Sequence, residues 1–252
     1  PGGECFNSVL VDLDDSGDLD IVVVRNATED VATYLNRGDG TFDFKTAVAA
    51  GTDPKAIKAC DFSGDGFADI AIANDTGVGI TILLGDGLGG LTLKGSTTCG
   101  VQPRELVAVD LDGNGAEDLV VVGGRGSNYV SRLLGRGDGT FYGPVDFTTG
   151  PRPNSVDAAD FNLDGFPDVA VANWSLDNET LATMTILYGD GAGGFPDQED
   201  YVPQAGFRKI TALAAGQLNQ ARFLRGDATG DGVLNITDPI RTLRYLFLGD
   251  TL

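Results

Sequence analysis

Histidine is absent from the 252 residues of this chain, and cysteine and basic residues are scarce. Histidine is the commonest general base and transition-metal ligand, so its absence disfavours zinc hydrolases and triad enzymes. The three cysteines, Cys5, Cys60 and Cys99, lack zinc-ligand spacing and allow at most one internal disulfide. No apolar run reaches the roughly 18 residues of a membrane span, so no membrane insertion is expected.

Only 17 basic residues face 37 acidic ones, which gives a formal net charge of −20. This balance disfavours nucleic acids and anionic membranes as partners and favours cations. Of the acidic residues, 31 are Asp and six are Glu. Because Glu is the better helix former, the bias towards Asp indicates turns and metal-binding loops rather than charged helices.

Four copies of a nine-residue, aspartate-rich segment occur at residues 12–20, 61–69, 110–118 and 160–168, which we call loops 1 to 4. Their starts lie 49, 49 and 50 residues apart. Positions one, three, five and nine have a side-chain oxygen, position six is Gly, and position seven is placed to offer a backbone carbonyl. Oxygen-only ligands of this number suit calcium better than magnesium, so we predict one calcium ion in each loop.

The predicted side-chain ligands are Asp12, Asp14, Ser16 and Asp20; Asp61, Ser63, Asp65 and Asp69; Asp110, Asp112, Asn114 and Asp118; and Asp160, Asn162, Asp164 and Asp168. The predicted carbonyl ligands are those of Asp18, Phe67, Ala116 and Phe166. A single segment of this kind is equally well explained as a solvated turn, but four superposable copies are not.

Apolar runs flank the loops and predict an all-β fold. Residues 106–109 precede loop 3, and residues 21–24, 70–73, 119–122 and 169–172 follow the four loops, as expected for strands buried on both faces. Third strands are predicted at 31–35, 80–84, 130–134 and 184–188. After Asp-Gly turns, fourth strands at the sheet edge are predicted to open at Phe42, Leu91, Phe141 and Phe195 and to include Lys45, Lys94, Pro144 and Pro196. Four antiparallel strands per repeat are typical of a β-propeller blade.

The loops and the Gly-Asp-Gly-Thr-Phe turn of repeats one and three make residues 6–220 resemble the FG-GAP and VCBS repeat families. Blades of these families form the propeller of integrin alpha subunits and of many secreted bacterial proteins. Ser16 and Ser63 stand where these families usually have Asp or Asn, so the resemblance implies weaker binding in loops 1 and 2. The resemblance implies a calcium-binding, extracellular β-propeller over residues 1–224, with four full blades and a degenerate fifth repeat at 214–219. Family propellers commonly have more blades, so the chain is part of a larger ring, a small ring or an open array.

Residues 225–252 follow a different pattern. Residues 227–238 match an EF-hand loop with Gly232 at position six, and the predicted ligands of one further calcium ion are Asp227, Thr229, Asp231, Asn235, Asp238 and the Val233 carbonyl. The segment resembles one half of a dockerin, which implies a cohesin-like docking partner. The alternative is a calcium-stabilised terminal helix that covers the edge of the propeller.

We therefore predict a non-enzymatic, secreted or cell-surface calcium-binding module that recognises a glycan or a protein. The alternative is a scaffold or surface-assembly protein with a C-terminal docking tag. A polysaccharide-active enzyme is disfavoured because we find no grouping of Lys, Arg or Tyr with carboxylates outside the loops. Arg-Gly-Asp triplets at 37–39, 136–138 and 225–227 fall in turns or at a metal loop, so adhesion through them is not expected.

Overall fold

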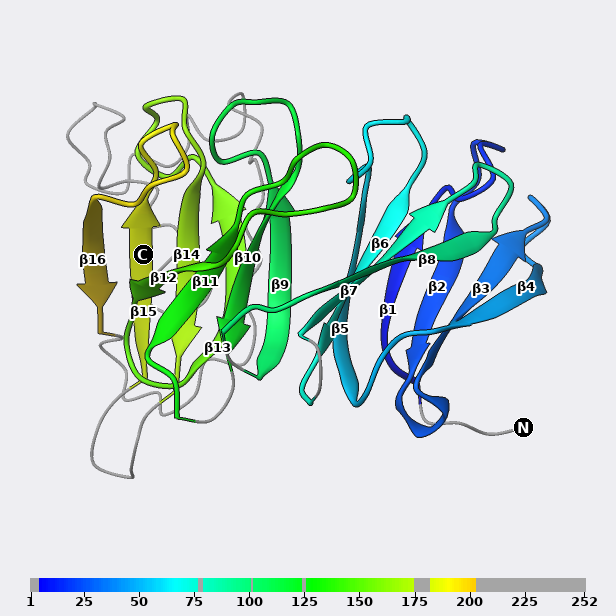
Figure 1. Ribbon diagram of the computed structural model, residues 1–252, viewed down its shortest axis with the longest axis horizontal. Helices are drawn as coiled ribbons and strands as arrows, with labels where there is room; N and C mark the ends of the chain where they lie inside the picture. Colours follow the sequence, from blue (N-terminus) through cyan, green and yellow to red (C-terminus); the bar gives the residue numbers. More distant parts are fainter. Residues whose placement is uncertain (1–4, 77–78, 101, 124–125, 175–181, 203–252) are drawn as a thin grey trace, which may run out of the picture.

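The computed structural model describes residues 5–76, 79–100, 102–123, 126–174 and 182–202. Within these residues the chain forms four antiparallel sheets of four strands each, and every sheet consists of strands that are consecutive in the chain (Figure 1). We call the sheets blades 1 to 4 in chain order. The predicted all-β array of four-stranded blades is thus confirmed.

The strand bounds follow the predicted repeats. Blade 1 contains β1 (Cys5–Val11), β2 (Asp20–Arg25), β3 (Asp30–Asn36) and β4 (Phe42–Ala49). Blade 2 contains β5 (Pro54–Cys60), β6 (Asp69–Asn74), β7 (Ile80–Gly85) and β8 (Leu91–Thr97). Blade 3 contains β9 (Pro103–Val109), β10 (Asp118–Gly123), β11 (Tyr129–Leu133) and β12 (Val145–Thr148). Blade 4 contains β13 (Pro153–Ala159), β14 (Asp168–Asn173), β15 (Thr183–Tyr188) and β16 (Asp197–Tyr201). A short 3-10 helix, η1 (Asn26–Thr28), was not predicted.

The blades pack face to face, and the apolar second strands form the core between them. Every residue of β6, β10 and β14 is buried, as the uninterrupted apolar runs predicted. In β2 only alternate residues are buried. Burial on both faces was therefore predicted wrongly for blade 1, because among the described residues a second sheet packs against only one of its faces.

The first strands of successive blades lie next to one another in the order β1, β5, β9 and β13. Three apolar clusters fill the spaces between consecutive blades. In the cluster between blades 1 and 2, Val22 and Val24 meet Ile70 and Ile72, and all four are fully buried. Burying such a side chain contributes about 1.5–3 kcal/mol, so each blade stabilises its neighbours.

The fourth strands lie at the outer edge of each sheet, and β4 and β8 open at Phe42 and Leu91 as predicted. In blades 3 and 4 the prediction was wrong. Phe141 forms only an isolated bridge with Gly135, and β12 and β16 begin directly after Pro144 and Pro196. Because proline lacks the N–H that a ladder requires, it delays the start of these two strands.

The predicted fifth repeat and the C-terminal segment fall within residues 203–252, which lie outside the described residues. The predicted domain boundary after residue 224 and the dockerin-like half stay predictions. None of the helices in the described part of the chain is long and apolar enough for a membrane crossing.

Candidate metal centre

Loops 1 to 4 connect the first and second strands of their blades, so the four repeats place them at equivalent ends of neighbouring sheets. Two backbone positions in each loop have left-handed φ. Position six is the predicted Gly, and its φ lies between 82° and 93° in Gly17, Gly66, Gly115 and Gly165. The sequence did not reveal position four, where φ is 57° in Asp15, 73° in Gly64, 70° in Gly113 and 62° in Leu163. These two left-handed positions curl each loop back on itself.

The position-one carboxylate organises the curl. In loop 1, Asp12 accepts hydrogen bonds from the backbone N–H groups of Ser16 at 3.1 Å and Gly17 at 2.8 Å. Asp61, Asp110 and Asp160 likewise accept hydrogen bonds from the backbone N–H groups of positions five and six of their loops. The loop closes around this carboxylate, which turns the side chains of the alternating positions towards one side.

The position-nine carboxylate is fully buried in all four loops. In loop 3, Asp118 accepts the N–H of Leu111 at 2.8 Å and the N–H of Gly135 at 2.7 Å. It therefore joins the start of its loop to the residues that follow the third strand. Asp20 and Asp168 accept the equivalent pair of bonds. Asp69 accepts the N–H of Gly85 in the same way, but at the start of its loop the donor is the N–H of Ser63, one residue later. Burial raises the pKa of Asp118 to about 6 and also raises the pKa of Asp69 and Asp168, because these carboxylates have no basic partner within the loop.

Loops 1 and 3 bring three carboxylates together. Oxygen atoms of positions one, three and nine all lie within 4.8 Å of one another, in the groups Asp12, Asp14, Asp20 and Asp110, Asp112, Asp118. Three anions at this separation repel one another strongly unless a cation lies between them. The set contains only oxygen donors, which suits a hard cation such as calcium.

Loops 2 and 4 differ because position three is neutral and the third carboxylate is at position five. Asp65 accepts the N–H of Phe67 at 2.9 Å. Asp164 accepts the N–H of Phe166 at 2.9 Å and the side-chain N–H of Asn162 at 2.8 Å. Among the described residues, groups of three converging carboxylates occur in loops 1 and 3 and not in loops 2 and 4. This division differs from the one predicted from Ser16 and Ser63, which stays a prediction.

Each of loops 1 to 3 is also held by the next blade. The backbone N–H groups of Gly89, Gly139 and Gly193, in the turns between third and fourth strands, donate to the carbonyls of Leu13, Phe62 and Leu111 at 3.0, 2.8 and 3.2 Å. Within blade 2, the ring of Phe67 lies over the turn residue Gly87, where a Cβ atom would be 2.3 Å from the ring. The loops are thus fixed from two sides.

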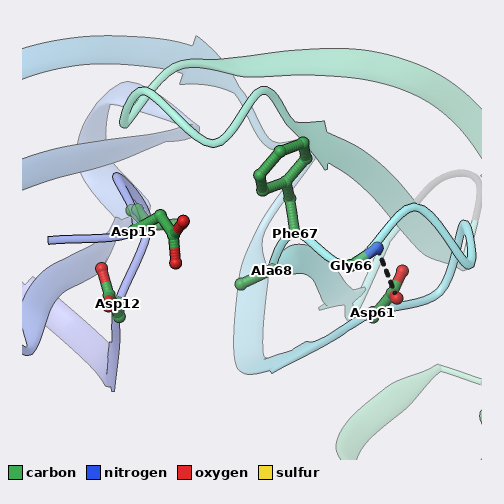
Figure 2. Close-up of a pocket in the computed structure, with 7 residues that line it drawn as sticks. Asp12, Asp15, Asp61, Gly66, Phe67 and Ala68 are labelled. Atoms are coloured by element: carbon green, nitrogen blue, oxygen red, sulfur yellow. Dashed lines mark hydrogen bonds between the residues drawn. The ribbon is translucent and has the colours of Figure 1, made fainter. Parts of the chain in front are cut away.

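A cleft of about 340 Å³ separates loop 1 from loop 2. Figure 2 shows Asp12 and Asp15 on one side of it and Asp61 and Phe67 on the other. Phe67 is 39% exposed, so an apolar ring and several carboxylates share one opening. Such a surface offers both stacking and charge to a ligand that approaches the loops.

The Arg-Gly-Asp turns have local partners. Arg37 forms an ion pair with Asp43 at 2.5 Å, and Arg136 lies over the ring of Tyr142 at 4.3 Å. Asp39 and Asp138 each accept the N–H and the hydroxyl of a threonine two residues later. These contacts agree with the turn role predicted for the first two triplets.

The sequence indicated no grouping of Lys, Arg or Tyr with carboxylates outside the loops, but the structure brings two tyrosines together at one glutamate. Glu199 accepts hydrogen bonds from Tyr188 of the neighbouring strand β15 at 3.4 Å and from Tyr201 of its own strand β16 at 2.5 Å. Burial raises the pKa of Tyr201 well above its usual range, so the phenol keeps its proton. The predicted ligands Asp227, Thr229, Asp231, Val233, Asn235 and Asp238 lie outside the described residues.

Comparisons with known proteins agree with the repeat architecture. A model of the FG-GAP-like repeat family matches residues 12–72, 61–121 and 110–171, which together cover more than half of the chain. A search of curated proteins finds no match.

Several solved structures share the fold. A protein from Lactobacillus plantarum superposes with a TM-score of 0.61 at 16% identity, over 84% of this chain and 58% of that one. The V. cholerae biofilm matrix protein Bap1 superposes with a TM-score of 0.50 at 15% identity, over 76% of this chain and 28% of Bap1. BBS1N, solved in complex with ARL6DN, superposes with a TM-score of 0.50 at 14% identity, over 75% of this chain and 56% of BBS1N. This chain thus spans less than two thirds of each of these structures.

Proposed function

Because the chain belongs to the FG-GAP-like repeat family, we propose that its aspartate loops bind calcium and that the blades form a non-enzymatic extracellular recognition module. The observation that supports this best is the convergence of three carboxylates in loops 1 and 3 within 4.8 Å. A cluster of this kind, in which the position-nine carboxylate is buried and has no basic partner in its loop, is unfavourable without a cation.

In this proposal each position of a loop has its own role in binding calcium. Position one closes the loop, position nine anchors it to the end of the third strand, and positions three and five supply the remaining side-chain oxygens. Position seven, Asp18 in loop 1 and Ala116 in loop 3, supplies a backbone carbonyl. Calcium, when bound, offsets the mutual repulsion of the carboxylates and stabilises the folded chain by binding linkage.

We propose that loops 1 and 3 fill before loops 2 and 4. In loop 4, the amide of Asn162 donates to Asp164, and this bond must break before both side chains turn to a cation. Asn162→Asp replaces that donor with a carboxylate and gives loop 4 carboxylates at positions one, three, five and nine. We expect this variant to bind calcium more tightly at loop 4, whereas Asp112→Asn weakens loop 3.

Native mass spectrometry during a calcium titration tests both points. Two ions are expected to bind first and further ions at higher calcium concentration, and a chelator is expected to remove them and lower the melting temperature. If a chelator changes neither mass nor melting temperature, calcium binding is refuted. If all four loops fill together, only the order is refuted.

The recognition role rests on the family and on the exposed chemistry near the loops. The cleft between loops 1 and 2 combines Asp15 with the exposed ring of Phe67, which suits a glycan whose hydroxyl groups approach the loops while an apolar sugar face stacks. The test is a glycan array with calcium, with chelator, and with Phe67→Ser. Loss of binding in the second and third arms is expected; absence of binding in every arm contradicts this role.

A further inference from the structure

A positively charged side chain lies in the seam between blades 3 and 4, next to loop 3. Arg132 belongs to β11 and is half-buried, and its guanidinium donates a hydrogen bond to the carbonyl of Gly193, in the turn between β15 and β16. The N–H of the same glycine donates to the carbonyl of Leu111, the second residue of loop 3, at 3.2 Å. Gly193 therefore connects Arg132 to the backbone of the loop.

The guanidinium is close to a predicted calcium ligand. A Cβ atom on Gly193 would be 3.2 Å from a terminal nitrogen of Arg132 and 3.5 Å from the Cβ of Asp112. The nitrogen and the Asp112 Cβ can therefore be no further apart than the sum of these two distances. The guanidinium also lies 5.6 Å from the centre of the Phe147 ring, which contacts the ring of Phe195 edge to face. Both blades thus hold the positive charge beside loop 3.

The seam does not need this charge. Thr33 has the same register position in blade 1, because it pairs with Val22 as Arg132 pairs with Val120. The neutral hydroxyl of Thr33 donates to the carbonyl of Gly89 at 3.4 Å, and the N–H of Gly89 donates to loop 1 at 3.0 Å. The two seams have the same chain of hydrogen bonds, which begins with a neutral donor at loop 1 and with a cation at loop 3.

The charge of Arg132 has no direct counterion. Among the described residues, no carboxylate lies within ion-pair distance of the guanidinium, and its Nε is buried without an acceptor. Blades 2 and 4 have the apolar residues Ile82 and Ile186 at this register position. The pKa of Asp190, in the neighbouring turn, is lowered chiefly by backbone N–H groups and further by Arg132. A half-buried charge is poorly screened, so it acts on groups beyond its contacts.

We propose that Arg132 lowers the calcium affinity of loop 3 below the value that its three carboxylates would give alone, an inference that rests on the proposed binding of calcium in the loops. In the empty loop the guanidinium offsets part of the repulsion among Asp110, Asp112 and Asp118. In the filled loop it repels the ion. Both effects act in the same direction, because the first stabilises the empty state and the second destabilises the filled one.

A calcium titration of the full 252-residue chain, followed by native mass spectrometry, tests the proposal in an Asp14→Asn background. This substitution removes a carboxylate from loop 1, so loop 3 keeps three converging carboxylates and the first ion reports on it. Arg132→Gln removes the charge but keeps an N–H donor for the carbonyl of Gly193. The dissociation constant of the first ion is expected to fall about tenfold, as for a unit charge close to a divalent ion at a half-buried position.

Two variants control for shape and for net charge. Arg132→Lys keeps the charge but changes the shape, so the dissociation constant is expected to stay within about twofold. Arg152→Gln makes the same change of net charge at an exposed residue before β13, at the end of that strand opposite loop 4, and is also expected to stay within about twofold. In an Asp112→Asn background the first ion reports on loop 1, and Arg132→Gln is expected to leave its affinity unchanged.

Tighter binding in Arg132→Gln alone supports the proposal. An unchanged or higher dissociation constant in Arg132→Gln overturns it. An equal fall in Arg132→Lys or in Arg152→Gln also overturns it, because shape or net charge would then be the cause. If no variant binds calcium, the proposed function fails as well, whereas calcium binding that Arg132→Gln does not strengthen overturns the role of Arg132 alone.

Discussion

The Asp118→Asn substitution separates two roles of the position-nine carboxylate. Asp118 is fully buried, and its two oxygens accept the N–H groups of Leu111 at 2.8 Å and Gly135 at 2.7 Å. Asparagine has the same shape but only one acceptor oxygen. One of the two backbone N–H groups therefore faces an amide NH₂ and loses its acceptor.

Two effects of similar size oppose each other when calcium is removed at neutral pH. A buried N–H group without an acceptor costs about 1–3 kcal/mol. Burial raises the pKa of Asp118 from its ordinary value of 3.8 to about 6, so ionised Asp118 destabilises the folded chain by about 3 kcal/mol. Asparagine removes that second cost. The free energy of unfolding in chelator is thus expected to change by less than about 2 kcal/mol.

With calcium the same substitution has a large effect. Calcium at about 100 times its dissociation constant stabilises a folded chain by about 2.7 kcal/mol per site, and the variant loses most of that contribution at loop 3. Urea unfolding followed by circular dichroism, in calcium and in chelator, measures both values, with Asp197→Asn on the exposed edge strand β16 as the control. An equal loss under the two conditions would refute the reasoning, because it would mean that the carboxylate is only a structural clamp.

Three further predictions follow from the packing and the pKa shifts. Leu119→Ala, fully buried between blades 2 and 3, is expected to lower the free energy of unfolding in urea by about 2–5 kcal/mol, whereas Leu93→Ala, 54% exposed, changes it by less than about 0.5 kcal/mol. Gly87→Ala places a Cβ atom 2.3 Å from the Phe67 ring at a φ of 65°, so its melting temperature is expected to fall further than that of Gly126→Ala, which has nothing within 4 Å and incurs only the left-handed backbone cost of about 1 kcal/mol. In chelator, the raised pKa of Asp118 makes the contribution of this residue to stability greatest below its ordinary pKa of 3.8, and the contribution is lost as pH rises through about 6. The melting temperature of the wild type in chelator is therefore expected to fall as pH rises over this range. The fall is expected to be smaller in Asp118→Asn, and smaller in the wild type with calcium.

The strands and the curl of the loops could be predicted because local patterns determine them. The apolar runs after each loop became β2, β6, β10 and β14, and the spacing of the aspartates set the bonds from Asp12 to Ser16 and Gly17. Each of these contacts joins residues at most a few positions apart. Position four was missed because it is Gly in loops 2 and 3 but Asp15 in loop 1 and Leu163 in loop 4, so no single residue type marks its left-handed φ.

Contacts between repeats could not be predicted in this way. The bond from Gly89 to the Leu13 carbonyl joins residues of two different blades, and it depends on how the blades stack. The half-burial of Ile21 has the same origin, because its apolar run is as long as those of blades 2 to 4 but only one neighbouring blade is described. An apolar run shows that a strand has two apolar faces; it does not show that two sheets are available to cover them.

Three carboxylates converge in loops 1 and 3 but not in loops 2 and 4, and the cause of this difference is geometric rather than compositional. At its four side-chain ligand positions every loop has three carboxylates and one neutral oxygen, so a count of these ligands treats the loops as equal. Moving the third carboxylate from position three, as in Asp112, to position five, as in Asp164, changes its neighbours. Position three lies beside positions one and nine, whereas position five lies where the N–H of position seven can hold it. The ligand positions of all four loops therefore have the same charge but differ in how much they must rearrange to bind a cation. We expect the free energy of this rearrangement in loops 2 and 4 to set the order in which the sites fill.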